Sequence, residues 1–228
     1  MIPLGILASA RVAAGSVATV DPATVSGALW SVQGADLTSG AISAWGSRFV
    51  QTDPEKQPTV DTLDGIKCAY FDGTEMLTNT GMYYLGTAQT MFAVVRPGFS
   101  TGHKYAIGLT SGSGVTLGVN NLKARQGAWG GDWAYDESAD SAALNGWCVI
   151  SGRYVPGTSF AARMNLDTPT TTATTTMATQ DRRNQLGGNA GAVSWIGGIA
   201  EAWNFDAALS DDDWAGIVAH LMSKYALT

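Results

Sequence analysis

Aromatic and acidic residues gather in one short stretch of the chain, where their types suit sugar binding. The stretch reads GAWGGDWAY from Gly127 to Tyr135. Aromatic faces stack on sugar rings, and a carboxylate accepts hydrogen bonds from sugar hydroxyls. Because Trp and Tyr are also enriched at protein interfaces, we favour sheet covering or a subunit contact over a sugar site. The candidate glycan contacts are Trp129, Asp132, Trp133 and Tyr135.

Acidic side chains continue beyond this stretch, and they raise the question of a calcium site. Asp132, Asp136, Glu137 and Asp140 cluster in what the glycine content predicts to be a loop. Calcium needs several oxygen ligands, and the EF-hand spacing is not present. We therefore favour a solvated acidic loop, with Asp132 and Asp136 as weak calcium candidates.

The cysteines and histidines do not indicate a metal or redox site. Cys68 and Cys148 lie in predicted strands among apolar neighbours. We favour two buried thiols over a disulfide, because sequence alone cannot place the two Cα atoms within the distance that a disulfide requires. His103 and His220 stand apart, and no C-x-x-C pair occurs. The pattern therefore does not support a zinc site, and we expect no cofactor.

Length and charge narrow the classes of protein. A chain of 228 residues falls within the range of a single β sandwich. The net charge is −6, and no basic run is present to neutralise phosphates, so a nucleic-acid partner is not expected. No apolar run reaches the ~20 residues that a membrane-spanning helix needs.

The predicted elements that would position these side chains are mostly strands. Residues 90–96 (TMFAVVR) are almost continuously apolar, as in a central sandwich strand. Residues 160–166 alternate apolar and polar or small side chains, which predicts that one face meets water. Asp72-Gly73 indicates a hairpin turn, with residues 75–78 as the return strand. The Thr-rich stretch 168–180 is typical of a solvated edge strand.

The end of the chain predicts one helix. Ser210 is a suitable N-cap, and Asp211 to Asp213 favour the positive end of the helix dipole. An apolar stripe with a period of 3.6 residues follows. Its members are Trp214, Ile217, Val218, Leu221, Met222 and Tyr225.

The first 24 residues form a different kind of segment. They are apolar and small, and they favour an extended arm over a helix. An apolar arm either packs on its own domain or docks on a partner. The candidate assembly contacts are Ile2, Pro3, Leu4, Ile6 and Leu7.

Several of these segments together resemble the concanavalin A-like, laminin G-like jelly-roll family. The resemblance is to the form found in bacterial surface proteins and tailed-phage structural proteins. It implies an all-β, two-sheet antiparallel jelly-roll sandwich (25–228) with one C-terminal α-helix and an extended N-terminal arm (1–24). The segments that carry it are residues 28–30, 43–45, 57–59, 69–73, 90–96, 147–225 and above all 195–201 with 208–211.

Glycosidases of this fold carry Glu-x-Asp-x-Glu on one strand, which places two carboxylates on one face. That string is not present, since Glu occurs only at positions 55, 75, 137 and 201. Glu201 lies in an apolar strand, where we expect it to bond to backbone or to Arg182 or Arg183. A G-x-S-x-G element is also missing, so we expect no catalytic residue and no enzyme.

The resemblance implies a non-enzymatic structural protein of a phage virion, either a head decoration protein or a tail accessory protein. Such a protein would assemble in the host cytoplasm and bind other virion proteins through its arm. A homo-oligomer is a further option. The alternative is a carbohydrate-binding module that recognises a host or surface glycan. Deviations from the family pattern, such as Asn165-Leu166-Asp167 in place of an Asn-Gly turn, leave both open.

Overall fold

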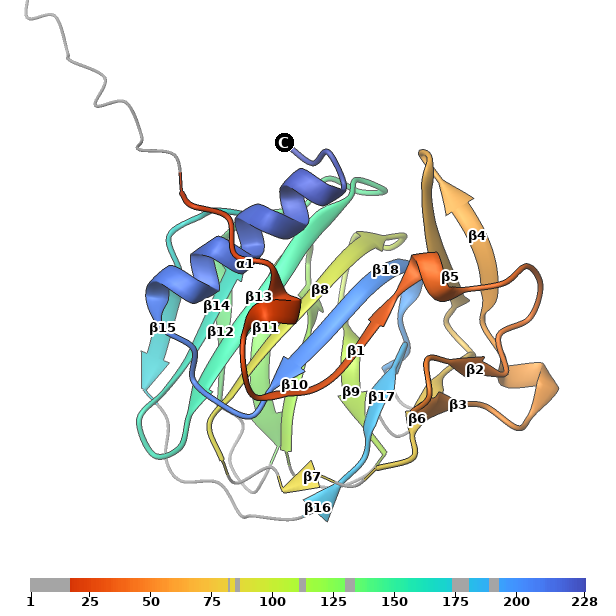
Figure 1. The fold of residues 1–228 in the computed structure, drawn as a ribbon, viewed down its shortest axis with the longest axis horizontal. Coiled ribbons are helices and arrows are strands. Elements are labelled where there is room, and N and C mark those ends of the chain that lie inside the picture. The colour runs from red at the N-terminus through yellow and green to blue at the C-terminus, as the bar shows by residue number, and fades with distance from the viewer. Residues whose placement is uncertain are drawn as a thin grey trace, which may run out of the picture.

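The protein is a two-layer β sandwich with one helix packed on it (Figure 1). The computed structural model describes residues 17–228 except 82, 85–86, 111–113, 130–133, 174–180 and 189–192. The predicted fold class is confirmed by two antiparallel sheets and a single C-terminal α-helix among these residues. The first 16 residues, including Ile2, Pro3, Leu4, Ile6 and Leu7, lie outside the described residues.

Sheet A carries the helix. Its order is β15–β14–β13–β8–β18–β5–β4, and β1 pairs with β18. Its strands are β1 (Ala28–Gln33), β4 (Thr59–Leu63), β5 (Ile66–Asp72), β8 (Gln89–Pro97), β13 (Cys148–Val155), β14 (Ser159–Met164), β15 (Thr170–Ala173) and β18 (Ile196–Phe205).

Sheet B forms the other layer, in the order β12–β11–β10–β9–β17–β6–β3–β2. Its strands are β2 (Ala44–Trp45), β3 (Phe49–Val50), β6 (Leu77–Asn79), β9 (His103–Leu109), β10 (Gly114–Asn120), β11 (Lys123–Trp129), β12 (Ala134–Ser141) and β17 (Asn184–Leu186). A separate pair joins β7 (Tyr83–Tyr84) to β16 (Asp181–Arg182). Three short 3-10 turns complete the described elements, at Pro22–Thr24, Gly34–Asp36 and Pro54–Lys56.

The helix α1 (Asp211–Lys224) begins as predicted. The Ser210 hydroxyl accepts a hydrogen bond from the Asp213 N–H at 3.1 Å, which caps the first turn. The apolar stripe of the helix packs on the outer face of sheet A, and Figure 1 shows α1 lying across that sheet. The buried members of the stripe are Trp214, Ile217, Val218 and Leu221.

Strand β8 has an apolar sequence because it lies between two cores. Met91 and Val95 face the core between the sheets, whereas Phe92 and Val94 face α1. A strand that is buried on both faces has a nearly continuous run of apolar residues. The predicted central strand is therefore confirmed, and the molecule has three layers: α1, sheet A and sheet B.

The two cysteines lie on opposite faces of sheet A. Cys68 belongs to the cluster under α1, and Cys148 belongs to the core between the sheets. Both are free and buried, which confirms the interpretation as two buried thiols.

Three local predictions were wrong. Asp72-Gly73 ends β5 but does not make a hairpin, because the next strand, β6, pairs with β3 and β17 of sheet B. Of the stretch 127–140, which was predicted to form loops, the described residues 127–129 and 134–140 lie in strands β11 and β12. In β14, Arg163 does not face water: it is 8% exposed because α1 covers that face.

The chain before β1 packs against the helix. The N–H of Val20 donates a hydrogen bond to the carbonyl of Gly216 at 2.9 Å. Val20 and Val25 pack on the apolar cluster under α1, and Pro22 is buried. A Cβ built at Gly216 would lie 2.4 Å from Val20 Cγ2, so the missing side chain makes room for this segment. Residues 17–25, which we call the N-terminal seat, are thus fixed on the α1 side of the sandwich.

Candidate functional site

The outer face of sheet B is the side of the sandwich that α1 leaves free. Leu117 of β10 points into the core, so its neighbour Gly118 faces outward. Gly118 lies opposite Tyr105 of β9 and opposite Arg125 of β11, and Arg125 lies opposite Glu137 of β12. Register thus places one row of outward side chains across four strands. We call this row, with His103, Asn120 and Tyr135 beside it, the sheet B face.

Tyr135 is the exposed ring of the sheet B face. Tyr135 is 43% exposed. The guanidinium carbon of Arg125 lies 3.6 Å from the centroid of the ring, which is a close cation–π contact. Because one face of the ring rests on Arg125, the ring is held in place for a ligand on its free side.

Glu137 supplies a carboxylate next to this ring. Its Oε1 accepts a hydrogen bond from Asn120 Nδ2 at 2.7 Å and lies 3.8 Å from Arg125 Nη1. The carboxylate is 26% exposed, so it keeps access to solvent. A partly exposed carboxylate beside an exposed ring offers one stacking surface and one hydrogen-bond acceptor.

His103 and Tyr105, both on β9, are not set up for acid–base chemistry. The rings of His103 and Tyr105 lie 4.1 Å apart between centroids. Burial, aided by the charge of Arg125, lowers the pKa of His103 to about 3. Burial also raises the pKa of Tyr105. Both side chains are therefore neutral near pH 7, which suits binding better than proton transfer.

Two nitrogen atoms of this face have no hydrogen-bond partner among the described residues. They are Nε2 of His103 and Nε of Arg125, and both are buried. Buried polar groups in proteins almost always have a partner, so such atoms gather where a water or ligand completes the site.

Of the candidate glycan contacts from the sequence, only Tyr135 has a described side chain. Asp132 and Trp133 lie outside the described residues, and of Trp129 only the backbone, at the end of β11, is described. Sequence reasoning missed Arg125, Asn120, His103 and Tyr105. The available signal was weak, because isolated polar residues in strands reveal their neighbours only once the register is known.

Asp136, a weak calcium candidate, is used inside the domain. It is 6% exposed, and its carboxylate accepts hydrogen bonds from the Ala162 N–H, the Thr170 hydroxyl and the Thr172 hydroxyl. These bonds join β12 to β14 and β15. No group of three or more His, Cys, Asp or Glu that could hold a metal ion occurs within the described part of the chain.

Glu201, the acidic residue predicted in an apolar strand, is 1% exposed on β18. Its carboxylate accepts hydrogen bonds from Trp203 Nε1 at 2.6 Å, Lys224 Nζ at 2.6 Å and the Tyr225 hydroxyl at 2.7 Å. These partners come from the end of α1 and from Trp203 on β18 itself, not from Arg182 or Arg183 as expected. The burial of Tyr225, together with the charge of Glu201, raises the pKa of that phenol. Glu201 is 1% exposed and accepts three hydrogen bonds, so its role is to anchor the helix.

Comparison with known proteins establishes the fold. No protein-family model and no curated protein sequence matches the chain. A heptameric SAP-like pentraxin from Limulus polyphemus superposes with a TM-score of 0.52 at 15% identity, over 66% of this chain and 80% of that one. The chain has a jelly-roll fold.

Two further solved structures share this jelly roll. Domain 4 of AbnA, a GH43 extracellular arabinanase from Geobacillus stearothermophilus in complex with arabinotriose, has a TM-score of 0.52 at 13% identity, over 80% of this chain and 86% of that one. The ligand binding domain of botulinum neurotoxin serotype D, in complex with N-acetylneuraminic acid, has a TM-score of 0.54 at 10% identity. That match covers 84% of this chain and 50% of the toxin chain.

Among the described residues, no helix of the jelly roll is long and apolar enough to cross a membrane.

Proposed function

We propose that the protein is a non-enzymatic glycan-binding domain that contacts its ligand through the sheet B face. The observation that carries this proposal is the exposed Tyr135 ring, fixed by Arg125 at 3.6 Å and flanked by the Glu137 carboxylate. The apolar side of a sugar ring stacks on such a ring, while Glu137 accepts hydrogen bonds from the hydroxyls.

The jelly-roll fold favours a glycan over other ligands for this face. Two structural neighbours were solved in complex with sugars, one with arabinotriose and the other with N-acetylneuraminic acid. Among the described residues, Glu137 is the carboxylate of the sheet B face, whereas Glu201 lies under α1 on the other side of the sandwich, so these two do not form the accessible carboxyl pair that glycoside hydrolysis requires. Binding without turnover is the function that these residues support.

A glycan array with the full chain tests the proposal. We expect wild type to bind a defined set of glycans, Tyr135→Ala to lose that binding, and Tyr135→Phe to keep most of it because the ring stays. Leu166→Ala is the matched control, because Leu166 is similarly exposed at 41% but lies in the turn after β14. Absence of binding by wild type across a broad array, or equal binding by Tyr135→Ala, would show the proposal to be wrong.

We also propose that the protein is an accessory protein of a tailed-phage virion and that it docks through its N-terminal arm. The N-terminal seat supports this proposal, because it fixes the root of the arm on the α1 side. The sheet B face lies on the other side of the sandwich. A domain attached through its arm would therefore present the sheet B face outward, away from the particle.

Deletion of residues 1–16 tests the docking role, because it removes the candidate assembly contacts and keeps the seat around Val20. We expect the truncated protein to fold with an unchanged melting temperature and to be missing from purified particles. Replacement of Ile2, Leu4, Ile6 and Leu7 by Ser is a milder variant with the same expected loss. Normal incorporation of both variants would exclude docking through the arm.

A further inference from the structure

A polar groove lies on the opposite side of the sandwich from the sheet B face. It runs between the first turn of α1 and the edge strand β15, with a volume of about 440 Å³. This size is within the ~300–1,000 Å³ of small-molecule sites. Its lining includes two cations and two anions, Arg153, Arg163, Asp211 and Asp212, with Thr171 at the edge.

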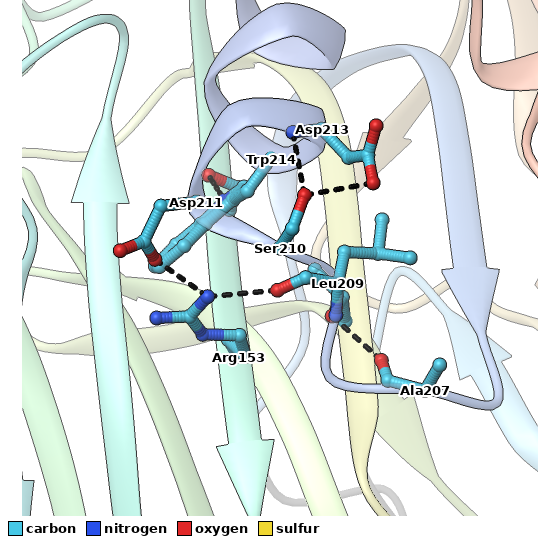
Figure 2. A network of polar contacts seen from close by, with 9 residues as sticks. Arg153, Ala207, Leu209, Ser210, Asp211, Asp213 and Trp214 are labelled. Atoms are coloured by element: carbon cyan, nitrogen blue, oxygen red, sulfur yellow. Dashed lines mark hydrogen bonds and ion pairs between the residues drawn. The ribbon is translucent and has the colours of Figure 1, made fainter.

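Arg153 forms the outer cation of this groove. Figure 2 shows its guanidinium between the backbone before α1 and the first helical turn. Its Nη1 donates to the Leu209 carbonyl at 2.8 Å and lies 2.7 Å from Asp211 Oδ1. The Asp211 side chain is 85% exposed, so this ion pair is open to solvent and can rearrange.

Arg163 forms the inner cation. The charges of Asp167 and Asp211 act on it, but no carboxylate within the described part of the chain forms a direct ion pair with it. It is 8% exposed, and its Nε donates to the Asp167 carbonyl at 2.7 Å. Its two terminal nitrogens make no hydrogen bond or ion pair within the described part of the chain. Burial lowers the pKa of Arg163, which reflects the cost of holding a charge there.

The two arginines contact the same aromatic ring. Arg153 and Arg163 project from neighbouring strands, and their guanidinium carbons lie 4.8 Å and 5.5 Å from the ring of Trp214. Trp214 is fully buried, and its Nε1 donates to Ser151 Oγ at 2.8 Å. The ring is thus a fixed platform that keeps two planar donor groups aimed at one groove.

We propose that this groove binds the carboxylate of an acidic sugar, such as a uronic acid residue, between Arg163 and Arg153. A guanidinium binds a carboxylate through two parallel hydrogen bonds, and Arg163 has its terminal nitrogens available for them. Asp211, Asp212 and Thr171 then accept or donate hydrogen bonds to the sugar hydroxyls. A phosphate dianion or an acidic peptide fits less well, because it brings additional negative charge next to both aspartates.

This site and the sheet B face are independent, because they lie on opposite sides of the three layers. The test is calorimetric titration of the full chain with glucuronate, with glucose as the neutral match and inorganic phosphate as the anion match. We expect glucuronate to bind and the other two to bind at least about tenfold more weakly, equivalent to ~1.4 kcal/mol. No glucuronate binding, or equal binding of glucose or phosphate, would overturn the proposal.

Variants test whether glucuronate binds in the groove. Arg163→Gln is expected to weaken glucuronate binding by about tenfold or more through the lost charge-assisted hydrogen bonds. Because this change can also disturb Trp214, Thr171→Glu provides a second variant on the exposed strand β15. It adds negative charge at the edge of the groove, so we expect weaker glucuronate binding and an unchanged melting temperature. Tyr135→Ala should leave glucuronate binding intact, and its loss there would assign the binding to the sheet B face instead.

Discussion

The carboxylate of Glu201 on β18 lies 2.6 Å from the ammonium of Lys224 in the last turn of α1. Glu201 is 1% exposed, whereas the Lys224 side chain is 34% exposed. The buried partner is therefore the one that depends on the contact. Together with Tyr225 and Trp203, this pair fastens the end of the helix to the centre of sheet A.

Glu201→Gln should destabilise the protein. The amide keeps the size of the side chain but loses the charge that pairs with Lys224, and its NH₂ faces donors. We expect a loss of about 1–3 kcal/mol in the free energy of unfolding, measured in urea. The control is Glu137→Gln, a partly exposed glutamate, which should change stability much less. An unchanged midpoint for Glu201→Gln would contradict the anchoring role.

The effect of Gly216→Ala on stability should depend on whether the N-terminal seat is present. In an exposed helix this change stabilises by about 1 kcal/mol, but here the new Cβ meets Val20 Cγ2 at 2.4 Å and the Ala18 carbonyl at 3.0 Å. We expect Gly216→Ala to destabilise the full chain and to speed proteolysis within residues 17–25. In a chain that lacks residues 1–24, the same change should become stabilising. Stabilisation in both backgrounds would show that the seat does not depend on this contact.

His103 should make the protein sensitive to acid. Its folded pKa is lowered from 6.5 to about 3, chiefly by burial, so below pH 6.5 the unfolded chain binds a proton that the folded chain refuses. The stability due to neutral His103 is thus complete above pH 6.5 and is lost as the pH falls toward 3, at up to ~1.4 kcal/mol per unit. We expect His103→Gln to flatten this slope in urea titrations at pH 4 to 7. His220→Gln removes the other histidine and serves as the control.

The thiols should be unreactive in the folded protein. Burial raises the pKa of both Cys68 and Cys148 to about 12, so the thiolate fraction at pH 8 is negligible. We expect no reaction with Ellman's reagent under native conditions and two equivalents in denaturant. A fast-reacting thiol at pH 8 would show that one of the two layers opens readily.

The parts of the fold that could be predicted are those whose pattern repeats locally. The apolar run in β8 and the stripe with its Ser210 cap predicted a central strand and α1, because burial on two faces or on one stripe leaves a periodic trace. The burial of Arg163 could not be predicted. The helix that covers it begins almost fifty positions later, and nothing near Arg163 in the sequence signals that contact.

The candidate site was predictable only as a single ring. Tyr135 stands out as an aromatic residue in a glycine-rich stretch, but Arg125, Asn120 and Tyr105 join it through the register of four strands. A shift of one residue in any of those strands would turn their side chains into the core. A Cβ at Gly118 would lie 2.1 Å from the Lys104 carbonyl oxygen, so glycine at this position permits the close approach of β9 and β10.

Both ends of the described chain pack in the helix layer. Val20 of the N-terminal seat and Leu227 of the C-terminal tail contact the same apolar cluster under α1. Connections made at either end therefore leave from one side of the domain. The domain is consequently suited to insertion into a surface loop of another protein or to display in tandem arrays, with the sheet B face still free to meet a ligand.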